Sequence, residues 1–211
     1  LYFVLEREAV KEIRFADISV EVATDLKAEF IAYLQGKLVN NPDLNYSLIT
    51  EADETSNSVY YYNLVEHPEE LQPLYDVNNQ EVFALIQNGN QQFENFSFVE
   101  DDLSKIIAFV ICLGNEANKV ILYKKHYHVS LMKRGSLYGL IPSRTRFEKF
   151  KDNMIKINDT VEFLMVNNEL IVLSLKTFQN SFGYDTIIRN KAEENLGIIE
   201  ATNLLEDVGG L

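Results

Sequence analysis

Two pairs of apolar runs in the second half of the chain predict two β-hairpins. The runs are residues 106–113, 119–126, 160–166 and 169–175. They are rich in β-branched and aromatic side chains, which favour strands. Asn167-Asn168 separates the second pair, and because asparagine tolerates a positive φ, this dipeptide fits a two-residue type I′ turn. Consecutive hairpins imply a largely antiparallel sheet.

The first half of the chain carries a helical pattern between residues 24 and 39. Its apolar positions are Leu26, Phe30, Tyr33, Leu34 and Leu38. They recur every three or four residues, which is the spacing of one helix face. We also predict short strands over residues 13–22 and 59–64 and a short helix over residues 68–75.

A further helix is predicted to begin at Thr145. Thr145 and Glu148 fit a capping box, in which the threonine hydroxyl and the glutamate carboxylate accept hydrogen bonds from backbone N–H groups of the first turn. The apolar face would hold Phe147, Phe150, Met154 and Ile157, and another face Arg146, Lys149, Asn153 and Lys156. A final helix is predicted after Asp185.

Together these elements predict an α+β fold, with a largely antiparallel sheet built from hairpins and flanked by helices. Residues 78–97 contain nine Asn and Gln, which is typical of a linker or a long loop. We therefore divide the chain into an N-terminal α+β part, residues 1–100, and a C-terminal part, residues 101–211, with one continuous domain as the alternative. Because the chain begins without Met and ends in Gly-Gly-Leu, we expect a fragment of a longer protein.

Charge is distributed unevenly along the chain. Residues 119–156, which we call the basic segment, hold ten of the 19 Lys and Arg but only two of the 32 Asp and Glu. The basic segment therefore carries +8 within a protein of net charge −13. Because the local field depends on nearby charges, an acidic protein with one basic segment can still offer a surface to a polyanion such as DNA.

The basic segment supplies the candidate phosphate contacts. They are Lys124, Lys125, Lys133, Arg134, Arg144, Arg146, Lys149 and Lys156. Tyr123, Tyr127 and Tyr138 lie among them and could stack on the bases of a single strand. Two alternatives stay open: a solvated face, and a docking surface for acidic protein or anionic lipid.

Conventional catalytic motifs are missing from the sequence. His126 and His128 would share one face of a predicted strand, but the only other His and Cys residues are His67 and Cys112, so no metal site is predicted. The chain has no phosphate-binding loop, no G-x-G-x-x-G turn and no G-x-S-x-G elbow. These absences point away from a conventional enzyme, and no cofactor is indicated.

A metal-dependent nuclease is a weaker alternative. Such a site would hold Mg²⁺ through carboxylates and would need an acid-x-Lys sequence on a hairpin strand. The candidates are Asp159, Glu162, Glu169 and Lys176. The residue two before Lys176 is Ser174, which is not an acid, so only a nuclease with an unrecognised site is kept as a hypothesis.

Residues 120–188 resemble the family of KwaB proteins from the Kiwa anti-phage defence system. The resembling features are Tyr-Lys-Lys at 123–125, Leu-x-Lys-Arg at 131–134, the phenylalanine-rich segment that follows, Phe-Leu-x-Val-Asn-Asn-Glu at 163–169, Leu-Lys-x-Phe at 175–178 and Phe-Gly at 182–183. They cover about a third of the chain and are structural in character.

The resemblance implies a cytoplasmic bacterial protein that binds DNA, forms a homo-oligomer and works with a KwaA-like membrane protein, which would place it peripherally at the inner membrane. It supplies no catalytic residues. One cysteine and no disulfide framework fit a reducing compartment. Our leading hypothesis is therefore a non-catalytic DNA-binding subunit of an anti-phage system.

Overall fold

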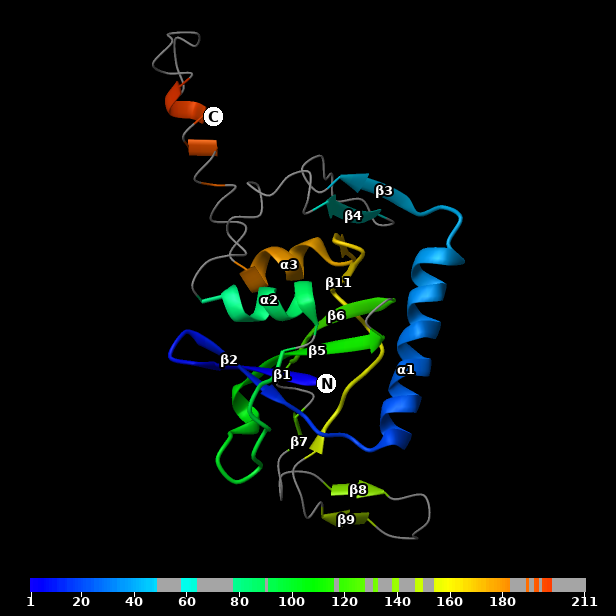
Figure 1. Cartoon of the computed structure of the whole chain (residues 1–211), viewed down its shortest axis with the longest axis vertical. Coiled ribbons are helices and arrows are strands. Elements are labelled where there is room, and N and C mark those ends of the chain that lie inside the picture. Colours follow the sequence, from blue (N-terminus) through cyan, green and yellow to red (C-terminus); the bar gives the residue numbers. More distant parts are fainter. Residues whose placement is uncertain are drawn as a thin grey trace.

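The computed structural model describes most of the chain. The described residues are 1–48, 58–63, 78–89, 91–115, 118–127, 131–132, 138–140, 147–149, 154–182, 189, 192–193 and 195–198. Within them, an eight-stranded sheet forms the centre of the molecule (Figure 1). No helix in this part of the chain is long and apolar enough to cross a membrane.

The sheet contains strands from both halves of the chain. Its order is β2 (Val10–Phe15), β1 (Tyr2–Arg7), β5 (Ile106–Gly114), β6 (Lys119–Lys125), β11 (Phe163–Val166), β12 (Glu169–Val172), β4 (Ser58–Asn63) and β3 (Asn45–Leu48). All neighbours are antiparallel except β3 and β4, which are parallel. The α+β fold with a largely antiparallel sheet, predicted from the hairpin pattern, is confirmed.

Both predicted hairpins are present. Strands β5 and β6 pair from Ala108↔Lys125 to Gly114↔Lys119, and β11 and β12 pair from Phe163↔Val172 to Val166↔Glu169. Asn167 and Asn168 have φ values of 49° and 64°, as a type I′ turn requires. The turn chemistry was therefore sufficient to predict this register.

Helix α1 (Val20–Leu34) confirms the helical pattern of residues 24–39. It begins four residues earlier than predicted, because the Ser19 hydroxyl caps it by accepting a hydrogen bond from the Val22 N–H at 3.3 Å. It continues as a short π-helix, η1 (Gln35–Val39). The strand predicted over residues 13–22 is consequently wrong beyond Phe15, where β2 ends.

Helix α2 (Gln80–Asn88) replaces the predicted linker. Its residues Val82, Phe83, Leu85 and Ile86 are buried in the core, so a loop over residues 78–97 is wrong for this stretch. The Asn and Gln residues that suggested a linker lie at the two ends of this short amphipathic helix or beside it in the sequence. The helix ends at Gly89, whose φ of 71° suits the left-handed position after a C-terminus.

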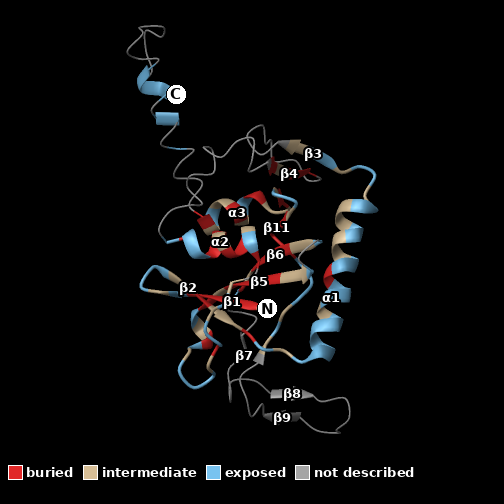
Figure 2. Ribbon diagram, viewed as in Figure 1, coloured by how far each residue is buried: buried red, intermediate tan, exposed pale blue. Residues whose placement is uncertain are grey.

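Two apolar layers cover the two faces of the sheet. Alternate residues of β1 belong to different clusters, as the period of a strand demands: Val4 packs with α2 and α3 (Leu175–Phe182), whereas Leu5 packs with Phe30 of α1. Figure 2 shows these buried positions along the central strands, with most of α1 exposed. Helix α1 thus covers its face through the fully buried Phe30 and the partly buried Leu26, Tyr33 and Leu34.

The helix predicted to begin at Thr145 is wrong. Phe147–Lys149 forms strand β9, which pairs with β8 (Tyr138–Leu140), and Met154–Ile155 forms β10, which pairs with β7 (Leu131–Met132). Local helical spacing is a weak signal that partner strands can override. Residues 145–146, 150–153 and 183–188 lie outside the described residues, as does the helix predicted at 68–75; residues 189, 192–193 and 195–198 are helical.

Candidate nucleic-acid interface

The candidate phosphate contacts occupy different environments. The side chains of Lys124, Lys125 and Lys156 are described, and the backbone of Lys149 lies in β9. The candidates outside the described residues are Lys133, Arg134, Arg144 and Arg146. The structure therefore places the two ends of the basic segment, at the end of β6 and between β10 and β11.

Lys124 is an internal anchor. Its side chain is 3% exposed, and its Nζ donates hydrogen bonds to the carbonyl oxygen and the Oγ1 of Thr160, both at 2.8 Å. Burial lowers the pKa of the Lys124 ammonium, while the carboxylates of Glu162 and Asp159 oppose that shift. Lys124 fastens the chain entering β11 to the end of β6, so we leave it out of the proposed DNA surface.

Lys125 faces the other way, because neighbouring strand residues alternate. Its side chain is partly exposed, and its Nζ lies 5.8 Å from the centre of the half-exposed Tyr127 ring. A cation beside an aromatic ring can contact a phosphate while the ring stacks on a base. Lys156 is exposed on the segment that leads to Thr160. Lys125 and Lys156 thus belong to the two segments that Lys124 ties together.

Glu162 organises the same junction through its side chain and its backbone. Its Oε2 accepts a hydrogen bond from the Lys125 N–H at 2.7 Å. Its carbonyl oxygen accepts from the Leu173 N–H at 2.8 Å and from the Ser174 N–H at 3.0 Å. One residue therefore joins the end of β6, the start of β11 and the approach to α3. Sequence reasoning missed this role; the available signal was a carboxylate inside an apolar strand run.

Burial raises the pKa of the Glu162 carboxyl, although the Lys125 N–H and the Lys124 ammonium oppose the shift. A carboxyl with a raised pKa in the folded state stabilises the fold in its protonated form. Its contribution is therefore lost as the pH rises from the ordinary glutamate value through the raised one.

We expect Glu162→Gln to gain stability relative to the wild type as the pH rises through this window, because glutamine keeps an acceptor for Lys125 without the buried charge. Urea unfolding at pH 4 and at pH 7 measures the difference in free energy of unfolding between the variant and the wild type at each pH. A variant that is less stable relative to the wild type at pH 7 than at pH 4 would contradict this account.

His126 is a core residue in the described structure. Its ring packs edge-on against Phe109, with ring centres 5.1 Å apart, and the backbone N–H of His126 donates to the Ile107 carbonyl at 2.7 Å. His128 lies outside the described residues. Within the described ranges, no three His, Cys, Asp or Glu side chains are grouped so that they could hold a metal ion.

The residues considered for a nuclease do not all lie together. Glu169 lies at the turn end of the β11–β12 hairpin, whereas Glu162 precedes its open end. Lys176 is exposed on α3. Asp159 and Glu162 both act on the Lys124 ammonium, whereas Glu169 and Lys176 do not join them at that position.

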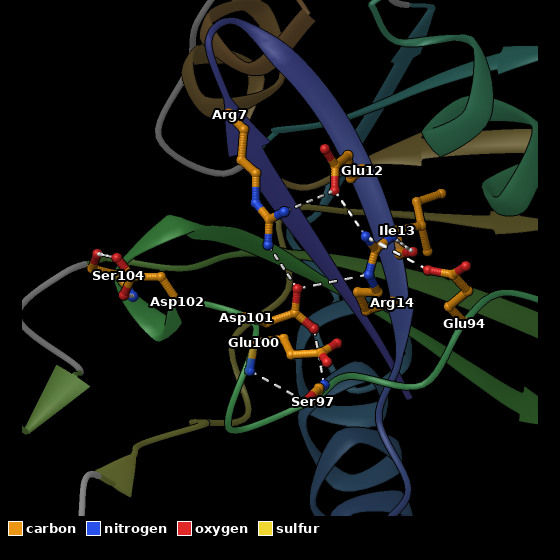
Figure 3. Close-up of polar contacts among 10 residues, drawn as sticks. All are labelled: Arg7, Glu12, Ile13, Arg14, Glu94, Ser97, Glu100, Asp101, Asp102 and Ser104. Carbon is orange, nitrogen blue, oxygen red and sulfur yellow. Dashed lines mark hydrogen bonds and ion pairs between the residues drawn. The ribbon is translucent and has the colours of Figure 1, made fainter.

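Two arginines of the N-terminal part are paired with carboxylates (Figure 3). Arg7 contacts Asp101 at 2.6 Å, and Arg14 contacts Glu12 at 3.0 Å. Because these cations are compensated locally, they add little to the field that a polyanion would meet. The excess of positive charge along the sequence lies in the basic segment, which carries +8.

A mostly antiparallel sheet flanked by helices defines an α+β protein, and the basic segment begins in its strand β6 and ends just after β10. The family model for Kiwa protein KwaB-like proteins matches residues 103–211, and the chain belongs to this family. The resemblance seen in the sequence is thereby confirmed.

One curated relative extends the similarity beyond the family model. The chain is 17% identical over 202 residues to Kiwa protein KwaB of Escherichia coli O55:H7 (strain RM12579 / EPEC). The match includes 95% of this chain but only 61% of that protein, so the chain spans about three fifths of its relative's length. No solved structure matches the chain.

Proposed function

We propose that the chain is the DNA-binding part of a component of the Kiwa anti-phage defence system. Membership of the KwaB-like family supports the place in the system. The concentration of ten Lys and Arg in residues 119–156 carries the DNA-binding proposal. In this proposal the protein is cytoplasmic, acts as a homo-oligomer without catalysing a reaction, and works with a KwaA-like membrane partner.

The charge distribution would guide DNA to one surface. The acidic remainder of the chain repels phosphates, while the basic segment attracts them. The contacts we propose are Lys125, Lys133, Arg134, Arg144, Arg146, Lys149 and Lys156. Lysine and arginine contacts to phosphates hold the duplex without reading its bases, so we expect little sequence preference.

The proposal predicts a steep dependence of DNA affinity on salt. Each phosphate contact should lower the logarithm of the affinity by roughly 0.9 per tenfold rise in salt, so the seven proposed contacts together give a slope of roughly −6. Fluorescence anisotropy of a labelled duplex over a salt series measures this slope. A flat dependence, or no binding at low salt, would count against the DNA surface.

The same DNA also tests the absence of catalysis. We expect it to stay intact during incubation with the protein and Mg²⁺ or Mn²⁺. Cleavage that requires the metal and scales with protein concentration would replace the binding proposal with the nuclease hypothesis.

A further inference from the structure

The turn that follows Phe96 displays two adjacent apolar side chains to solvent. Phe98 is 78% exposed and Val99 is 95% exposed. Single exposed apolar residues are normal on a protein surface. Phe98 keeps an edge-on contact with the core residue Phe96, with ring centres 5.1 Å apart, yet both Phe98 and Val99 are largely exposed. Two such neighbours at the tip of one turn need a further reason. We call residues 97–102 the apolar turn.

Hydrogen bonds within the apolar turn close it on itself (Figure 3). The Asp101 N–H donates to the Ser97 carbonyl at 2.8 Å, and the Ser97 N–H donates to Oδ2 of Asp101 at 2.9 Å. The Glu100 N–H donates to the Ser97 hydroxyl at 3.2 Å. These bonds fix the backbone on both sides of Phe98 and Val99.

Ion pairs attach the apolar turn to the hairpin formed by β1 and β2. Oδ1 of Asp101 accepts a hydrogen bond from Arg7 at 2.6 Å and lies 3.8 Å from Nε of Arg14. The Asp101 side chain is only 6% exposed, so this contact is largely shielded from water. Beside it, the Phe96 N–H donates to the Phe15 carbonyl at 2.7 Å. The turn is therefore organised before any partner arrives, which lowers the entropy cost of docking.

The charges around the tip indicate what could cover it. Glu94, Glu100 and Asp102 are exposed near Phe98 and Val99 in the sequence. An acidic surround repels both DNA and anionic lipid headgroups. The acidic residues around two apolar side chains complement an apolar pocket with a basic rim. Loops on the cytoplasmic side of membrane proteins are enriched in Lys and Arg, so they can supply such a rim.

We propose that Phe98 and Val99 dock into an apolar, basic-rimmed pocket on the cytoplasmic side of the membrane partner. This inference rests on the proposed function, because that function supplies the partner. The basic segment then contacts DNA, and the apolar turn contacts the protein partner. Their opposite charges keep the two ligands on separate surfaces.

Binding to the KwaA-like membrane protein, held in nanodiscs of neutral lipid, tests the proposal. We expect the Phe98→Ser/Val99→Ser variant to bind at least tenfold more weakly than the wild type. Glu94→Lys/Glu100→Lys should also weaken binding, since it reverses the charge of the surround. The matched control is Val20→Ser/Val22→Ser, which changes two other exposed apolar residues on α1 and should bind like the wild type.

The outcomes separate the inference from the proposed function. If the wild type and Phe98→Ser/Val99→Ser bind the partner equally, the docking surface is wrong and the function stands. If the wild type does not bind the partner at all, both the docking surface and the proposed partner fail. Equal binding of the wild type to empty nanodiscs, lost in the same variant, would assign the turn to lipid and overturn the inference. DNA affinity within twofold of the wild type shows that the variant is folded.

Discussion

Replacing Phe163 with alanine is expected to lower the free energy of unfolding by about 3–5 kcal/mol. Phe163 is fully buried in the middle of the sheet. Its ring stacks on Tyr123 with centres 4.4 Å apart and meets Phe178 and Phe182 edge-on at 5.3 and 5.5 Å. The substitution would remove the apolar burial and three aromatic pairs, and would leave a cavity between β6, β11 and α3.

Urea unfolding of Phe163→Ala measures the loss, and Phe98→Ala is its matched control. The control makes the same chemical change at an exposed site and should change the free energy of unfolding by no more than about 0.5 kcal/mol. Since a domain is stabilised by about 5–15 kcal/mol in total, the core variant should unfold at a much lower urea concentration. Equal midpoints for both variants would contradict the described core.

The sequence predicted the parts of the fold that depend on local chemistry. The β11–β12 hairpin follows from Asn167-Asn168, because asparagine suits the positive φ of the turn. The β1–β2 hairpin was not predicted, for the opposite reason. Its turn residues, Glu8 and Ala9, also have positive φ values, 52° and 66°, yet neither residue type favours that conformation. Here the pairing of β1 with its neighbours decides the structure.

Tertiary contacts also explain why the candidate site was only partly predictable. The sequence located the positive charge, but it did not distinguish Lys124 from Lys125. The two differ because Lys124 finds Thr160, which lies 36 residues away, and Lys125 points to the other face. The pairing of Phe147–Lys149 with β8 likewise overrides a local capping box. Patterns within one segment cannot reveal contacts that depend on distant strands.

Reversing four charges of the basic segment is expected to abolish DNA binding at moderate salt. The variant Lys133→Glu/Arg134→Glu/Arg144→Glu/Arg146→Glu removes four proposed phosphate contacts. With roughly 0.9 log units per contact between about 0.1 M and 1 M salt, the affinity at about 0.1 M should fall by roughly 10³- to 10⁴-fold. The new carboxylates add repulsion to this loss.

A control with the same net charge separates the local surface from the overall charge. Its substitutions are Lys27→Glu, Lys37→Glu, Lys105→Glu and Lys176→Glu, which all lie outside the basic segment. Both variants change the net charge from −13 to −21. Non-specific repulsion would therefore weaken both equally, whereas loss of direct contacts would weaken only the first.

The most direct measurement is the dissociation constant of a labelled duplex at about 0.1 M salt for the wild type and these two variants. The account predicts at least a 1,000-fold loss for the basic-segment variant and a loss of less than about tenfold for the charge-matched control. Equal losses in both variants, or a wild type that does not bind, would contradict the claim that the basic segment is a DNA-binding surface.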